Sequence, residues 1–153
     1  MRVFVTSDSA AGTGVGEASG SICEKMEKEF KPKTFGPGLS EVVIVLMCRD
    51  PEYGFKQRVR HSRAERILYL DVMLDWDEML RAGPKRRMAG TRDAFALRSA
   101  VLDAMKRTVR EVFARRRVSD FDVPGFLGEF DAVCDRLGNR PQGPSFPVKL
   151  RKA

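Results

Sequence analysis

The sequence predicts an α+β fold in which helices pack on a mainly antiparallel sheet of about four strands. Strand-like segments gather in the first half of the chain and helical segments in the second half, in the order strand, helix, three strands, three helices. Apolar and polar residues alternate over 55–61 and again over 66–75, with a short polar turn between them, which is typical of a hairpin. We see no internal repeat and no second core.

The first two elements are expected to be a short strand and an amphipathic helix. β-branched and aromatic residues at 3–6 favour a strand. Apolar residues then recur at every fourth position from Ala18 to Phe30, with Glu and Lys between them, which predicts a helix over 16–30. Pro32 and the Gly-Pro-Gly turn at 36–38 end this helix.

The middle of the chain predicts three consecutive strands. The continuous apolar run within 41–49 is typical of a strand buried on both faces. The hairpin that follows is expected to close at 62–65, with its apolar side chains facing inward. In this register the expected cross-strand pairs are Val59 with Leu68, Arg60 with Ile67, Arg58 with Tyr69, and Lys56 with Asp71.

Three helices are expected after the hairpin. Asp75 and Glu78 form a capping-box-like pattern at the start of a short helix that Gly83 and Pro84 end. The apolar periodicity then predicts a long helix over about 92–117 and a last helix over about 123–137. We therefore expect one domain over 1–138 and an extended, proline-rich tail over 139–153.

The net charge of +7 is concentrated in one segment. Residues 84–117 hold eleven Lys or Arg and three Asp or Glu, which exceeds the net charge of the whole chain. A localised basic face attracts acidic proteins or phosphates. The long helix therefore offers a candidate binding face, with a plain solvated surface as the alternative; its basic residues are Arg92, Lys106, Arg107, Arg110 and Arg117.

The outward face of the hairpin is a second candidate for binding a partner. It combines arginine with tyrosine and aliphatic side chains, a composition that is enriched at protein interfaces. The alternative is that a helix covers this face and makes it part of the core. The candidate residues are Lys56, Arg58, Arg60, Tyr69 and Asp71.

The sequence predicts no catalytic, cofactor or metal site. Three separated cysteines and the single histidine, His61, do not make a zinc site. The glycine-rich loop at 12–16 misses the phosphate-binding motifs, and capping or pairing explains the carboxylates of Asp71, Asp75 and Asp77. Arg98 falls in the apolar stripe of the long helix, so its head group either reaches out to solvent or pairs with an acid.

We expect a cytoplasmic protein that is not in the membrane. The N-terminus lacks the apolar stretch of a signal peptide, and the apolar run at 42–48 is too short to span a bilayer. The cysteines suit a reducing compartment as small buried hydrophobes.

The hairpin segment KQRVRHSRAERILYLDVMLD, residues 56–75, resembles the central hairpin of an immunity-protein family of bacterial polymorphic-toxin and contact-dependent growth-inhibition systems. The resemblance extends over about 20–115. It implies a small non-enzymatic cytoplasmic protein that binds and neutralises one cognate toxin, and it transfers no binding residue position by position. Immunity proteins against nuclease toxins are often acidic, whereas this chain is basic.

The basic segment leaves a nucleic-acid-binding accessory protein as the alternative function. Such a protein would hold the phosphate backbone with Lys and Arg. Base recognition would need aromatic or base-reading side chains on the same face, and the long helix carries none there.

Overall fold

A computed structural model describes residues 1–9, 15–49, 57–75 and 91–139 of the chain. The expected short helix after Asp75 lies outside the described residues, as does the expected tail over 139–153 except for Asn139, which is the last residue of the final helix. The three long helices expected from periodicity are present, each within two residues of its predicted ends. The elements are β1 (Arg2–Ser9), α1 (Val15–Phe30), β2 (Glu41–Arg49), β3 (Val59–Ser62), β4 (Ile67–Asp75), α3 (Thr91–Arg115) and α4 (Val123–Asn139).

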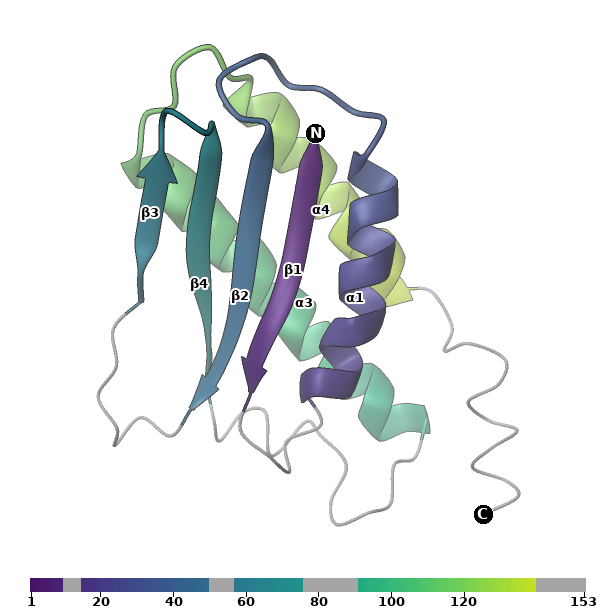
Figure 1. Ribbon diagram of the computed structural model, residues 1–153. Helices are drawn as coiled ribbons and strands as arrows, with labels where there is room; N and C mark the ends of the chain where they lie inside the picture. The colour runs from purple at the N-terminus through teal and green to yellow at the C-terminus, as the bar shows by residue number, and fades with distance from the viewer. Residues whose placement is uncertain (10–14, 50–56, 76–90, 140–153) are drawn as a thin grey trace.

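The class α+β is confirmed, but the prediction of a mainly antiparallel sheet is wrong. The four strands lie in the order β1-β2-β4-β3 (Figure 1). β1 pairs with β2 in parallel, β2 pairs with β4 in parallel, and only β3 and β4 are antiparallel. The expected meander would have placed β3 beside β2, whereas β4 lies between them.

The physical reason is the match between the two central strands. β2 and β4 are both nine residues long and largely apolar, so pairing them side by side buries the most apolar surface. β3 is four residues long and carries Arg60 and His61, which suits it to the edge of a sheet.

The hairpin of β3 and β4 is present with a register shifted by two residues from the expected one. Its cross-strand pairs are Val59 with Leu70, Arg60 with Tyr69, His61 with Leu68, and Ser62 with Ile67. A four-residue turn over 63–66 allows this shift, with Arg66 in the left-handed region at φ 58°. Because side chains alternate with a period of two, a two-residue shift leaves Arg60 and Tyr69 on the outward face.

All three described helices pack on one side of the sheet. Figure 1 shows α3 and α4 behind the strands and α1 beside β1. The inward side chains of the strands are fully buried against the helices, and the core extends through a cluster of phenylalanines centred on Phe126. The inward strand residues are Val3, Val5, Val42, Ile44, Leu46, Leu68, Leu70, Val72 and Leu74.

No described helix covers the opposite side of the sheet. Val43 and Val45 of β2 are only half-buried there, whereas Met47 on the same side is 3% exposed, so the expectation of a strand buried on both faces is wrong for the first part of β2. Phe4, Ile67 and Tyr69 are likewise half-buried. No described helix covers this second face, which is partly exposed around Val43 and Tyr69 and nearly buried at Met47 and Asp71.

Arg98 is buried among the helices, with 6% of its surface exposed. Its head group therefore does not reach out to solvent, which removes one of the two expectations for this residue.

Candidate partner-binding surface

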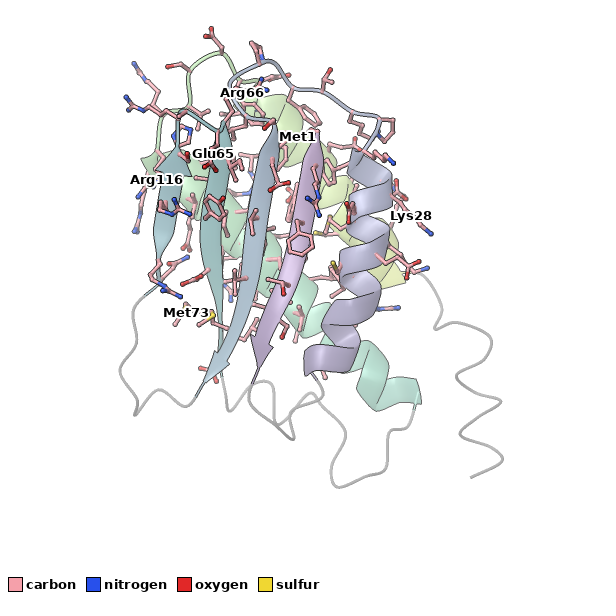
Figure 2. All side chains as sticks on the ribbon, viewed as in Figure 1. Met1, Lys28, Glu65, Arg66, Met73 and Arg116 are labelled. Atoms are coloured by element: carbon pink, nitrogen blue, oxygen red, sulfur yellow. The ribbon has the colours of Figure 1, made fainter. Side chains whose placement is uncertain are left out.

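The outward side chains of the four strands form one continuous surface, which we call the open face. The strand register arranges them in rows across the sheet. One row runs Phe4, Val43, Tyr69, Arg60, and the next contains Thr6, Val45 and Asp71. Because the alternate residues of each strand are buried against the helices, these side chains are directed away from the helices, and Figure 2 shows Met73 toward one end of β4. The open face therefore has an apolar and aromatic centre with charged groups around it.

Arg60 and Tyr69 form a stacked pair at the β3 side of the open face. The guanidinium carbon of Arg60 lies 4.1 Å from the centroid of the Tyr69 ring. The Tyr69 hydroxyl donates a long hydrogen bond of 3.5 Å to Oε2 of Glu65. Such a cation–π pair stabilises an exposed site by about 0.5–1 kcal/mol. Stacking also restricts both side chains before any partner arrives, which lowers the entropy cost of binding.

Asp71 has a structural partner in Arg58. The backbone N–H and Nε of Arg58 both donate to Oδ2 of Asp71, each at 3.2 Å. The Asp71 side chain is only 7% exposed, whereas that of Arg58 is 78% exposed. The expected pairing of Asp71 with Lys56 is therefore wrong, because the two-residue register shift places Arg58 opposite Asp71. Lys56 itself lies outside the described residues.

The carboxylates that could have held a metal do not converge within the described residues. Asp71 is bound to Arg58, and Asp75 lies at the end of β4. Asp77 and the glycine-rich loop at 10–14 lie outside the part of the chain that is described. Across the described ranges, no three His, Cys, Asp or Glu side chains group closely enough to bind a metal ion.

Two of the basic residues expected on the long helix bind α4. Nζ of Lys106 lies 2.8 Å from Oδ1 of Asp135, and a hydrogen bond to Asp135 raises the pKa of Lys106. Arg110 forms an ion pair with Asp131. These contacts fasten α3 to α4, so much of the charge expected to be free is neutralised within the protein.

The remaining basic residues of the long helix are not alike. Arg107 and Arg117 are exposed, and neither has a carboxylate partner among the described residues. Arg92 lies in the first turn of α3, where side chains are outside the described set.

Arg116 is a surface residue that the sequence analysis missed. It follows the last residue of α3, and its Nη2 donates to the backbone oxygen of Val59 at 3.3 Å. This contact brings the Arg115–Arg117 run to the outer edge of β3, next to the open face (Figure 2). Three consecutive arginines were the available signal, but nothing in the sequence placed them beside β3.

The apolar centre of the open face was also missed in part. Phe4 belongs to a strand that was predicted from composition alone, without assigning its faces, and Val43 and Val45 belong to a strand that was expected to be buried on both faces. The alternation of half-buried and buried residues in β2 exists only because helices cover one side of the sheet.

The described helices pack on one side of the sheet, and the other side bears arginine and tyrosine. This composition is typical of the interfaces of protein-binding domains. The family model described as Imm44, immunity protein 44, matches residues 1–136 of the chain. The chain therefore belongs to the immunity protein 44 family, which confirms the resemblance to an immunity-protein family. No curated protein and no solved structure matches the chain significantly.

The family sets the broad function. Immunity proteins are generally non-enzymatic, and membership of the family indicates neutralisation of a toxin. Of the helices in the described part of the chain, none is both long and apolar enough to cross a membrane.

Proposed function

We propose that this protein is a non-enzymatic immunity protein that binds and neutralises a cognate bacterial toxin domain in the cytoplasm. The toxin would belong to a polymorphic-toxin or contact-dependent growth-inhibition system. The observation that carries the proposal is the match of the immunity protein 44 family over residues 1–136. The open face supports it, because no described helix covers this side of the sheet, so a protein partner could pack there without displacing any described element.

The open face is the proposed toxin-binding surface. Arg60 and Tyr69 are the residues of this face that we expect to contribute most to the binding free energy. Arginine and tyrosine are the residue types most enriched among interface residues that dominate affinity. The half-buried side chains of Phe4, Val43 and Ile67 would lose their remaining contact with water in a complex. Arg58 would contribute from the rim, since its side chain is exposed while Asp71 holds its Nε.

The basic residues of α3 have a smaller role in this proposal. Arg117 would steer the encounter with the toxin, because it follows Arg116 beside β3 and exposed charge acts mainly on the association rate. Lys106 and Arg110 hold α4 and contribute to stability instead.

The first test is protection of cells. The toxin polypeptide encoded by the neighbouring reading frame is expressed with and without this protein, and growth is followed. Survival only in the presence of this protein, together with a stable complex on size-exclusion chromatography, is the expected result. Continued toxicity with no complex between the two purified proteins would contradict the proposed function.

Nucleic-acid binding is the second candidate, and the Arg115–Arg117 run is the observation that favours it. Phosphate binding would weaken steeply with salt, with a log–log slope set by the number of contacts. A titration of duplex and single-stranded DNA or RNA between 50 and 300 mM NaCl tests it. This range spans the salt concentration at which the Debye length is about 10 Å. No binding at the lowest salt concentration would exclude this candidate.

A further inference from the structure

Three arginines lie beside one residue of the edge strand, Val59. Arg58 and Arg60 flank Val59 in sequence, and Arg116 donates to the backbone oxygen of Val59 from the far end of α3. Figure 2 shows Arg116 beside β3. We call Arg58, Arg60 and Arg116 the arginine edge. The contact between Arg116 and Val59, which are 57 positions apart in sequence, brings the three arginines into one strongly basic border of the open face.

The hydrogen-bonding capacity of the arginine edge is largely unused. A guanidinium has five N–H donors in a planar fork. Arg116 commits one nitrogen to Val59, and Arg58 commits Nε to Asp71. Arg60 lies over the Tyr69 ring, which occupies a face of the guanidinium and leaves its in-plane donors available for a bidentate contact.

Other arginine pairs in the described part of the chain show what Arg60 and Arg116 lack. Arg2 binds Glu27 and Glu41, Arg110 binds Asp131, and Arg136 binds Glu29 and Glu129. By contrast, Arg60 and Arg116 have no carboxylate partner among the described residues. These arginines are matched by carboxylates of the chain itself, as Arg58 is by Asp71, whereas within the described ranges Arg60 and Arg116 are not.

We propose that the arginine edge is a carboxylate-binding site, and that the toxin surface covered by this protein is acidic where it meets Arg60 and Arg116. This inference rests on the proposed function and names the chemistry of the partner. Carboxylates that enter the edge would gain bidentate, charge-assisted hydrogen bonds. They would also relieve the repulsion between neighbouring guanidiniums.

The aromatic rings of the open face favour an acidic protein over a nucleic acid. Proteins that bind single strands stack bases on exposed aromatic rings. Here Arg60 covers the ring of Tyr69, and the guanidinium carbon of Arg2 lies 4.9 Å from the centroid of the Phe4 ring. Both rings already carry a cation, so neither offers a free platform for a base, whereas a carboxylate can bind the edge of a stacked guanidinium.

The experiment compares three full-length variants with the wild type in binding the toxin polypeptide from the neighbouring reading frame. Arg60→Gln/Arg116→Gln removes two unpaired charges, and Arg60→Lys keeps the charge but removes the planar fork. Arg107→Gln is the matched control, because Arg107 is an exposed arginine of α3 that also lacks a carboxylate partner among the described residues. Kd is measured by calorimetry at 50 and 300 mM NaCl, and thermal melting checks that each variant is folded.

We expect the double variant to weaken Kd by about 100-fold or more, since charge-assisted hydrogen bonds contribute about tenfold or more each. Arg60→Lys should fall between the double variant and the wild type, and Arg107→Gln should change Kd less than about threefold. Wild-type binding should weaken with salt, and the double variant should show a smaller salt dependence.

The outcomes distinguish a failure of the acidic-partner inference from a failure of the proposed function. Wild-type binding that is unaffected by the double variant would overturn the acidic-partner inference and leave the proposed function standing. No binding of the toxin by the wild type would overturn both. If the double variant does not fold, a wild-type Kd that does not change between 50 and 300 mM NaCl would overturn the inference. Binding of single-stranded DNA that depends on Arg60 and Arg116 would assign the edge to phosphates instead.

Discussion

The guanidinium of Arg60 on β3 lies over the ring of Tyr69 on β4, and the two residues are direct cross-strand partners. The pair stands where the apolar centre of the open face meets the arginine edge. Tyr69 extends the row begun by Phe4 and Val43, and Arg60 begins the basic border that Arg58 and Arg116 continue. A partner bound here would touch an apolar centre and a charged rim together, which is the usual anatomy of a protein interface.

Replacing Tyr69 by alanine should weaken toxin binding without unfolding the protein. Truncation of a dominant interface residue costs about 2 kcal/mol or more in binding, which is about 30-fold in Kd. Tyr69 is half-buried on a face that no described helix covers, so the melting temperature should change little. Calorimetry and thermal melting measure the two effects. Tyr69→Phe is the control, because it keeps the ring under Arg60. A large drop in melting temperature with unchanged affinity would instead place Tyr69 in the core.

Replacing Asp71 by alanine should destabilise the fold. The change leaves the backbone N–H of Arg58 without its acceptor and removes a charge-assisted hydrogen bond at a nearly buried carboxylate. We expect the free energy of unfolding in urea to fall by about 2–3 kcal/mol. Arg58→Ala should cost under about 1 kcal/mol, because its side chain is exposed. Equal losses for the two variants would show that the ion pair, and not the burial of Asp71, sets the energy.

Lys106→Ala and Arg110→Ala should act on stability and not on the toxin. Their partners Asp135 and Asp131 belong to α4, so each substitution loosens the packing of α3 on α4. Because these pairs are partly exposed, each should lower the free energy of unfolding by under about 1 kcal/mol. Calorimetry with the toxin polypeptide should give the wild-type Kd. A tenfold loss of affinity with unchanged stability would mean that the toxin replaces the α4 carboxylates.

The thiol of Cys134 should resist alkylation in the folded protein. Burial raises the pKa of Cys134 to about 12, so almost no thiolate is present at pH 8. Mass spectrometry after treatment with iodoacetamide at pH 8 should find Cys134 unmodified in buffer and modified in urea. Modification of Cys134 at the same rate in buffer and in urea would show that α4 opens readily.

The same pKa shift makes stability depend on pH. The unfolded thiol loses its proton near pH 9, whereas the folded thiol keeps it to about pH 12. The unfolded state therefore binds fewer protons in this window, and stability should fall as the pH rises from 9 towards 12. Urea melts at pH 8 and pH 10.5 should show a smaller difference for Cys134→Ala than for the wild type. An identical difference would mean that Cys134 does not titrate in this way.

Several features of this protein were determined by the sequence itself. The helices α1, α3 and α4 follow from an apolar residue at every third or fourth position, which is a local property of the chain. The outward direction of Arg58, Arg60 and Tyr69 follows from alternation in the hairpin, and it survives the shift of register because that shift is an even number of residues. The hairpin residues also carried the resemblance to an immunity-protein family.

The tertiary structure alone decided which strands are neighbours and which charges are used within the fold. Strand order depends on pairing between segments distant in sequence, and alternation within β4 does not reveal that β2 lies on one side of it and β3 on the other. The same holds for charge. Lys106 and Arg110 look like a free basic face until α4 supplies Asp135 and Asp131. Arg116 joins the open face only because α3 ends beside β3. Local patterns fix the direction of a side chain within its own element, whereas its partner is fixed by the packing of elements against one another.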